Sequence, residues 1–338
     1  MKSLIIIFII FINILLFPQN IARDYPLQKA YLGNFITFNN DTIKNCFTTY
    51  RIFGTMNKDS SNIIFFPTWL AGNSEHIGVL LSKYSFIDTN KFCIISIDAL
   101  GNGYSASPSN TEIFPQITFN DITEAYYKTL TQHLKISKLY AIVGGSMGGM
   151  TAFHFAVKYP DFAKRIISYV SSPKLSSFDL LWINLQINLV EYLLSLNIPN
   201  KDIKAFSDMI TALISRTPAH LNKSVPTSDF YEYFKKFYKE PDSIYTLKNY
   251  LTQLKAIITY DITSDFNYDM KKATDEIKAQ LFIIVSDSDM MVNPDNAIEF
   301  ANLSKSKLLV LNNNCGHMAV NCEMEKVKDT INNFLTSD

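Results

Sequence analysis

Neither sign of charge is in excess in this chain of 338 residues. Lys and Arg together number 31, Asp and Glu together also number 31, and the formal net charge is zero. Proteins that bind nucleic acid usually present a basic face, so the composition gives no indication of a nucleic-acid partner. With 47% hydrophobic and 18% charged residues, the chain has the composition of a rather apolar globular protein. Its length suits one large domain with an insertion, or two small domains.

Glycine is missing from a long internal stretch. All eleven glycines lie between Gly33 and Gly149 or at Gly316. Residues 171–273 are instead rich in Leu, Ile, Tyr, Phe and Lys, and prolines separate segments of helical periodicity such as 180–196 and 229–238. We therefore expect a helical cap at 171–273, inserted into a core made of residues 23–170 and 274–338. Most of its apolar helix faces should pack on each other and on the core, and some could line a pocket.

Cysteine is scarce, and its spacing matches no zinc site. The four cysteines are Cys46, Cys93, Cys315 and Cys322. Cys93 lies in an apolar run and is predicted to belong to the core. Cys315 and Cys322 flank a histidine near the C-terminus and could pair in an oxidising compartment. Three pairings of four cysteines are possible, and free buried thiols are also compatible with the sequence. We expect neither a metal nor a cofactor.

The N-terminus carries one long apolar run. Residues 4–17 are apolar except for Asn13, which is short for a membrane span of about 20 residues and typical of the apolar region of a secretory signal. We expect residues 1–22 to be a signal peptide cleaved after Ala22, although Asn20 is larger than the residue usual at that position. The protein would then be secreted or periplasmic. The alternative is an uncleaved segment that anchors the protein to a membrane through residues 4–17.

Strands and helices alternate along the rest of the chain. Apolar runs rich in β-branched and aromatic residues predict strands at 47–53, 62–66, 92–97, 140–143, 166–169, 280–285 and 307–311. Helical patterns between them include 120–134, 150–159, 296–303 and 325–335. This alternation predicts an α/β fold with a mostly parallel central sheet flanked by helices.

The most informative motif is the sequence Gly144-Gly145-Ser146-Met147-Gly148. It is a G-x-S-x-G pattern between an apolar run and a helical pattern, which is the strand, tight turn and helix of a nucleophile elbow. The small flanking residues allow the close backbone approach that such a turn requires. We predict that Ser146 is a catalytic nucleophile; the alternative is an ordinary strand-to-helix turn.

A serine nucleophile needs a base, normally a histidine oriented by a carboxylate. On this kind of sheet the chain order is serine, acid, histidine. Of the five histidines only His317 follows the last predicted strand, in a polar loop directly after Gly316. The preceding predicted strand is followed by Asp287 and Asp289, and spacing alone permits either as the acid.

A tetrahedral intermediate also requires two backbone N–H donors. One is expected from Met147, the residue after the nucleophile. The other is expected from the loop 67–72 after the strand 62–66, where Leu70 or Trp69 could supply it.

Several of these segments together resemble the homoserine O-acetyltransferase family of α/β-hydrolases. The similar segments are the extended elbow at 144–150, a strand signature at 50–57, the oxyanion loop at 67–72, residues 98–111 and 114–121, the acid loop at 287–289 and the histidine loop at 316–317. The resemblance implies an α/β-hydrolase fold, an acyl-serine intermediate and an acid at Asp289.

The chain also departs from that family. Its members acylate homoserine with acetyl-CoA, a cytosolic thioester, whereas we expect this chain to be exported to a compartment without acetyl-CoA. Arginine, which often binds carboxylates, occurs only at Arg23, Arg51, Arg165 and Arg216. The family's arginine-rich acceptor-binding segment is not recognisable.

We therefore expect an exported serine hydrolase that cleaves a small-molecule acyl ester or thioester. In this hypothesis Ser146 attacks, His317 transfers the proton, Asp289 orients His317, and the N–H groups of Leu70 and Met147 stabilise the oxyanion. A second hypothesis is a homoserine O-acetyltransferase whose N-terminal segment is a tether facing the cytosol. A third is a non-catalytic binding module on a retained hydrolase fold.

Overall fold

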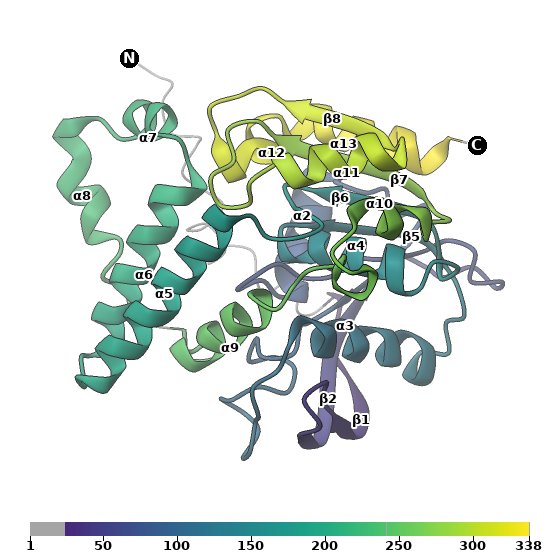
Figure 1. Cartoon of the computed structure of the whole chain (residues 1–338), viewed down its shortest axis with the longest axis horizontal. Coiled ribbons are helices and arrows are strands. Elements are labelled where there is room, and N and C mark those ends of the chain that lie inside the picture. Colours follow the sequence, from purple (N-terminus) through teal and green to yellow (C-terminus); the bar gives the residue numbers. More distant parts are fainter. Residues whose placement is uncertain (1–23, 241, 338) are drawn as a thin grey trace.

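An eight-stranded sheet lies at the centre of the computed structural model, which describes residues 24–240 and 242–337 (Figure 1). The strand order is β1-β2-β4-β3-β5-β6-β7-β8; the pairs β1–β2 and β2–β4 are antiparallel, and all other neighbouring pairs are parallel. The strands are β1 (Gln28–Ile36), β2 (Thr42–Phe53), β3 (Ile63–Phe65), β4 (Cys93–Ile97), β5 (Leu139–Gly145), β6 (Ala163–Tyr169), β7 (Gln280–Ser286) and β8 (Lys307–Leu311). The predicted α/β-hydrolase fold, with its mostly parallel sheet, is confirmed.

The central strands read as continuous apolar runs because both of their faces are covered. Every residue of β3 and β4 is buried, as expected for strands inside a parallel sheet with helices on both sides. Cys46 and Cys93 are buried in this core as free thiols. Burial raises the pKa of Cys46 to about 12 and that of Cys93 to about 11, so both remain protonated and unreactive at neutral pH.

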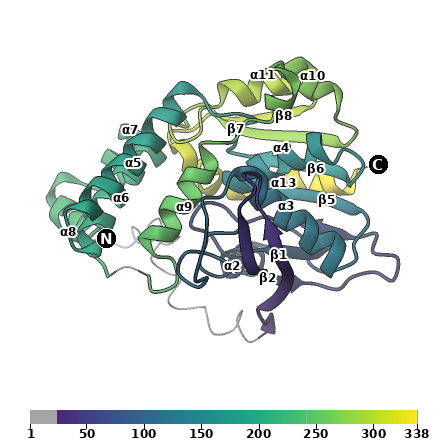
Figure 2. The same cartoon turned by 60° about the horizontal axis from the view of Figure 1, so that its bottom comes forward.

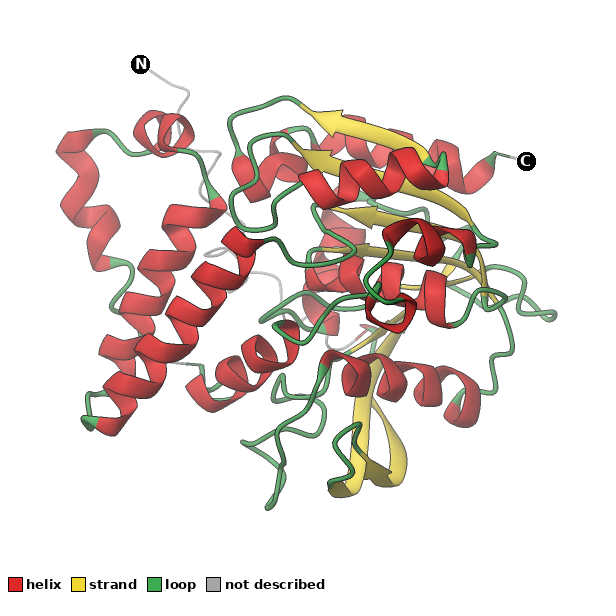
Figure 3. Ribbon diagram, in the orientation of Figure 1, coloured by secondary structure: helices red, strands yellow, loops and turns green. Residues whose placement is uncertain are grey.

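Helices cover both faces of the sheet (Figures 2 and 3). One apolar cluster joins the sheet to α2 and α13, and a second joins it to α3, α4 and α11. The core helices are α2 (Ser74–Tyr84), α3 (Phe119–Lys128), α4 (Met147–Lys158), α10 (Met270–Asp275), α11 (Asp295–Ser304), α12 (Ala319–Cys322) and α13 (Met324–Thr336). The predicted helix 120–134 is α3 followed by a π-helical turn, Thr129–His133.

Besides α10, five described helices lie between β6 and β7 in the chain. They are α5 (Ser177–Ser195), α6 (Asn200–Ser215), α7 (Pro218–Ser224), α8 (Phe230–Lys235) and α9 (Leu247–Ile257). Side-chain caps begin several of them: Ser176 and Asp179 form a capping box on α5, and Thr246 caps α9. They stand to one side of the sheet (Figure 1). We call these five helices the cap.

The strand β1 was not predicted from the sequence. Only Ala30 and Phe35 of its hydrophobic residues are buried, and register irregularities flank Gly33. An edge strand with so few inward-facing residues lacks the alternation by which strands are recognised.

The predicted signal peptide, residues 1–22, lies outside the described residues. Within residues 24–240 and 242–337, no helix combines the length and apolarity needed to cross a membrane.

Candidate active site

Ser146 lies at the sharp turn between β5 and α4. Its backbone has φ 54° and ψ −125°, a region that a residue with a side chain rarely occupies and that costs about 1–3 kcal/mol. The turn is fixed by Ser146 N–H donating to Tyr169 O at 3.0 Å. A Cβ on Gly144 would lie 2.2 Å from the Gly148 carbonyl oxygen, so only glycine allows the strand and the helix to approach this closely. The sequence pattern therefore produces an elbow with a serine at its apex.

The structure brings Ser146, His317 and Asp289 together. His317 Nε2 lies 3.0 Å from Ser146 Oγ, and His317 Nδ1 lies 2.7 Å from Asp289 Oδ2. The three side chains follow β5, β8 and β7, whose parallel arrangement places their carboxyl ends at one edge of the sheet. Since an ionised carboxylate only accepts, it holds the proton on Nδ1 and leaves the Nε2 lone pair facing the serine hydroxyl.

Of the two aspartates that spacing left open, Asp289 is the one at the histidine. Its Oδ1 accepts hydrogen bonds from the N–H groups of Met291 and Val292, at 2.9 and 3.0 Å. These bonds fix the carboxylate and direct Oδ2 at His317, and the residue is only 5% exposed. Asp287 is exposed.

The cap supports the acid loop. Trp182 Nε1 on α5 donates to Met291 O at 2.9 Å. The fully buried Asp179, also on α5, accepts from Asn293 N–H at 3.0 Å. Burial raises the pKa of Asp179, although its hydrogen bonds oppose that shift. Two residues near the start of α5 thus hold the segment that follows Asp289, a role that nothing in the sequence indicated.

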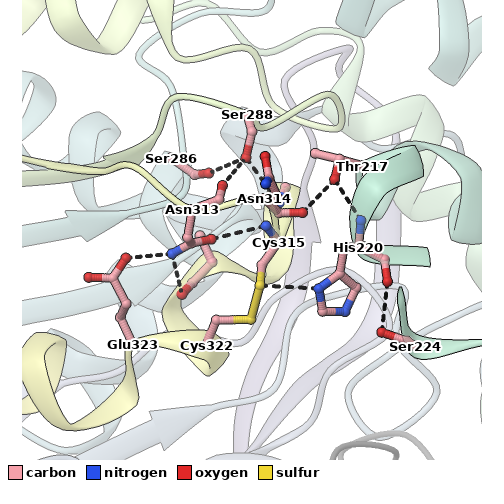
Figure 4. The surroundings of a disulfide bond; sticks show 12 residues. Thr217, His220, Ser224, Ser286, Ser288, Asn313, Asn314, Cys315, Cys322 and Glu323 are labelled. Carbon is pink, nitrogen blue, oxygen red and sulfur yellow. Dashed lines mark hydrogen bonds between the residues drawn. A yellow bond between two sulfur atoms is a disulfide. The ribbon is translucent and has the colours of Figure 1, made fainter. Parts of the chain in front are cut away.

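The histidine loop is tied to its surroundings by side chains shown in Figure 4. Ser288 Oγ donates to Asn313 O at 2.6 Å and accepts from Gly316 N–H at 3.2 Å, which joins the acid loop to the histidine loop. Cys315 and Cys322 form a disulfide. On the cap side, Thr217 Oγ1 donates to Asn314 O at 2.5 Å. The loop that carries His317 is therefore held from the acid loop, from the C-terminal helices and from the cap.

The same cysteines lie beside His220 of α7. His220 Nδ1 is 3.3 Å from Cys315 Sγ, and the donor atoms of His220, Cys315 and Cys322 all lie within 4.8 Å of one another. Cysteine binds a metal as its thiolate, and the sulfur atoms of Cys315 and Cys322 are joined in a disulfide. With the disulfide formed, the imidazole of His220 is the one metal ligand left in this cluster. We therefore assign the cluster a structural role.

The loop expected to complete the oxyanion hole joins β3 to α2. It packs directly on the start of α4, because a Cβ on Gly148 would lie 2.6 Å from Pro67 O. Met147 is the first residue of α4, where backbone N–H groups have no acceptor within the helix. The half-buried Leu70 lies in a turn closed by Gly72 N–H donating to Trp69 O at 2.8 Å. The two main-chain segments predicted to supply N–H donors are thus in contact.

Asp98 and Asn102, for which sequence reasoning gave no role, anchor this loop from the core. Asp98 is fully buried and accepts from Ser74 N–H at 2.6 Å and from Ser74 Oγ at 2.9 Å. Burial raises the pKa of Asp98 to about 6, against the opposing effect of these bonds. Asn102 Nδ2 donates to Gly72 O at 3.2 Å.

The remaining histidines make other contacts. His76 stacks on Trp69, and His133 lies 3.3 Å from the Tyr50 hydroxyl. His154 is buried, and burial lowers its pKa to about 3. It lines a cavity of about 240 Å³ with residues of α3, α4 and the segment 259–266, none of which belongs to the site at Ser146.

Comparison with known proteins identifies the family and the fold. Residues 62–320 match the family described as alpha/beta hydrolase fold. The chain is 30% identical to an ethyl acetate hydrolase of Pseudomonas veronii over 172 residues, which is 49% of each protein. The aligned part thus spans about half the length of that relative. Similarity to the homoserine O-acetyltransferase of Nautilia profundicola is lower but longer, at 26% identity over 86% of this chain and 92% of that protein.

Solved structures show the same fold. An acetylester hydrolase from Corynebacterium glutamicum superposes with a TM-score of 0.81 at 23% identity, covering 92% of this chain and 95% of that one. A homoserine O-acetyltransferase from Bacillus anthracis superposes with a TM-score of 0.80 at 18% identity, covering 93% of this chain and 98% of that one. The predicted resemblance to homoserine O-acetyltransferases is confirmed at the level of sequence and fold.

Proposed function

This chain belongs to the α/β-hydrolase fold family, and from that premise we propose that it is a serine hydrolase that cleaves an acyl ester or thioester. The observation that carries the proposal is the hydrogen-bonded series Ser146, His317 and Asp289, at 3.0 and 2.7 Å. It supplies a nucleophile, a base and an orienting carboxylate in the order that acyl transfer needs.

In the first half of the reaction Ser146 Oγ attacks the substrate carbonyl while its proton passes to His317 Nε2. The negative charge that develops on the carbonyl oxygen is stabilised by the N–H groups of Leu70 and Met147. His317 then gives the proton to the departing alcohol or thiol, which leaves an acyl group on Ser146. Asp289 stabilises the imidazolium and keeps Nδ1 protonated throughout.

In the second half, water replaces the leaving group. His317 takes a proton from the water, which attacks the acyl-serine carbonyl. The tetrahedral intermediate collapses, the carboxylic acid departs, and the proton returns to Ser146 Oγ.

Two arginines of the chain, Arg51 and Arg165, are buried in other contacts. They are therefore not available to bind the carboxylate of an amino-acid acceptor, which favours water as the acceptor. Arg51 is buried and donates to Tyr25 O at 2.5 Å. Arg165 is buried with its guanidinium carbon 4.8 Å from the centre of the Tyr140 ring.

A second candidate is a homoserine O-acetyltransferase, and Arg216 favours it. This partly buried residue ends α6, and its Cα would lie 3.1 Å from a Cβ on Gly316, the residue before His317. An arginine beside the histidine loop could receive the carboxylate of an amino-acid acceptor. The relatives named homoserine O-acetyltransferase also align over most of this chain, for example 84% with that of Sulfurimonas autotrophica.

One experiment separates the candidates. The protein lacking residues 1–22 is incubated with acetyl-CoA, with and without L-homoserine, and with p-nitrophenyl acetate, while thiol or phenol release is followed. The hydrolase proposal expects ester cleavage that does not need homoserine and is abolished in Ser146→Ala. Thiol release that requires both homoserine and Ser146 would establish the transferase instead. Absence of both activities would favour the non-catalytic binding module.

We propose further that the chain is exported. The apolar run at 4–17 and the disulfide between Cys315 and Cys322 both support this, since disulfides persist in oxidising compartments. N-terminal sequencing of the protein isolated from its host tests the proposal: a mature chain that starts after Ala22 is expected. An intact chain recovered from membranes would indicate an anchor.

A further inference from the structure

The cap helix α9 reaches the oxyanion loop through one side chain. Gln253 is fully buried on α9, and its Oε1 accepts hydrogen bonds from Ala71 N–H at 3.3 Å and from the Tyr245 hydroxyl at 3.0 Å. Ala71 directly follows Leu70, whose N–H is the proposed oxyanion donor. The contact thus joins the cap to the part of the loop on which the chemistry depends.

The orientation of this amide is determined by its neighbours. A backbone N–H can only donate, so the oxygen of Gln253 and not its nitrogen must face Ala71. Nε2 then has no partner among the described residues. Burying an amide is unfavourable unless it is hydrogen-bonded, and an apolar side chain of equal length would fill the same space without that cost. What the Gln253 amide adds, and an apolar side chain could not, is therefore its hydrogen bond to Ala71 N–H of the oxyanion loop.

The loop needs a restraint at this point. Ala71 has φ 60°, the left-handed region that residues other than glycine rarely adopt without support. On the core side Asn102 Nδ2 holds Gly72 O at 3.2 Å. On the cap side Gln253 holds Ala71 N–H. The turn that presents Leu70 is thus fixed from both sides, by one amide of the core and one of the cap.

We propose that Gln253 is a positioning residue for the oxyanion hole, so that docking of the cap helix α9 sets the position of the Leu70 N–H group. The inference rests on the proposed serine hydrolase function. Gln253 does not take part in bond making; it acts through the main chain of the loop. Its removal should weaken stabilisation of the tetrahedral intermediate and leave substrate binding nearly unchanged.

The variants Gln253→Met and Gln253→Glu test this. Methionine keeps the length and loses the acceptor, whereas glutamate keeps an acceptor oxygen for Ala71 N–H in either protonation state. We expect Gln253→Met to lower kcat for p-nitrophenyl acetate about tenfold, the effect of losing one hydrogen bond, with KM changed less than twofold. Gln253→Glu should recover most of that loss.

Asn249 provides a matched control one helical turn earlier on α9. It is also fully buried, but its Nδ2 donates to Ser109 Oγ and Ile244 O, both at 2.8 Å, and not to the oxyanion loop. Asn249→Leu should lower the melting temperature about as much as Gln253→Met, because each removes a buried contact of α9. It should lower kcat much less.

A pair of inhibitors gives a readout that loss of stability alone does not change. An aliphatic trifluoromethyl ketone adds to Ser146 and places an oxyanion in the hole, whereas the corresponding secondary alcohol binds by shape only. Gln253→Met should weaken the ketone about tenfold and the alcohol less than twofold, and Asn249→Leu should leave their affinity ratio unchanged. Equal weakening of both inhibitors, or no weakening of either, would overturn the role of Gln253. If the wild-type protein itself does not bind the ketone more tightly than the alcohol, the proposed function fails, and this inference fails with it.

Discussion

Replacing Asp289 by asparagine should disable the histidine while leaving the loop intact. In the native protein Oδ1 accepts from two backbone N–H groups and Oδ2 faces His317 Nδ1 at 2.7 Å. Asparagine has one oxygen, and the two N–H groups of Met291 and Val292 can only donate. The oxygen must therefore stay with them, and the amide NH₂ must face His317.

That arrangement reverses the tautomer of the imidazole. An NH₂ group donates to Nδ1, so the proton moves to Nε2, which then cannot accept the proton of Ser146. The side chain of Asp289 is 1% exposed, so water has little access to restore the native pattern. A loss of about 10⁴-fold in kcat, or about 5.5 kcal/mol of transition-state stabilisation, is expected.

The assay is steady-state hydrolysis of p-nitrophenyl acetate, with thermal unfolding as a check that the variant is folded. Asp287→Asn is the matched control, since Asp287 is two residues away and exposed; its kcat should change less than about threefold. If Asp287→Asn is the more damaging variant, or if Asp289→Asn retains more than about a tenth of wild-type kcat, the assigned acid is wrong.

Three further predictions concern Asp98, Gly148 and the disulfide between Cys315 and Cys322. Burial raises the pKa of Asp98 to about 6 in the folded state, against about 4 in the unfolded state, so between these pH values the Asp98 carboxyl is protonated only in the folded protein. The free energy of unfolding should therefore fall by about 2–3 kcal/mol from pH 4 to pH 6. Chemical denaturation of Asp98→Asn should lack this part of the pH dependence. Gly148→Ala should lower kcat about 10- to 100-fold in the same ester assay, because its Cβ would lie 2.6 Å from Pro67 O and displace the oxyanion loop; unchanged kcat would contradict the packing described. Replacing Cys315 and Cys322 by serine should lower the free energy of unfolding by about 2–3 kcal/mol, measured by chemical denaturation against wild type; an unchanged value would show that the disulfide contributes nothing.

The centre of the fold could be predicted from the sequence because its signals are local. Strands such as β4 are buried along their whole length and read as unbroken apolar runs. The edge strand β1 could not be recognised, since Ala30 and Phe35 are its only buried hydrophobic residues. Its position depends on pairing with β2, which is a tertiary contact.

The residues of the candidate site also differ in how far local sequence signals identify them. Ser146 is marked by a motif of adjacent residues, and His317 by its place after the last strand. Spacing alone permits Asp287 or Asp289, the family resemblance implies Asp289, and in the structure it is Asp289 that lies 2.7 Å from His317 Nδ1. Gln253 could not have been found from sequence patterns, because it contacts Ala71 across 182 positions of the chain.

The most direct test of the account is to trap the acyl group and locate it. The protein is mixed with p-nitrophenyl acetate, quenched in acid within the first turnover and examined by intact and peptide mass spectrometry, with Ser146→Ala as control. We predict that one acetyl group appears on Ser146, disappears as hydrolysis proceeds, and is absent from the control. Ester cleavage without acetylation of Ser146, or acetylation of another residue that survives in Ser146→Ala, would contradict the proposed acyl-serine mechanism.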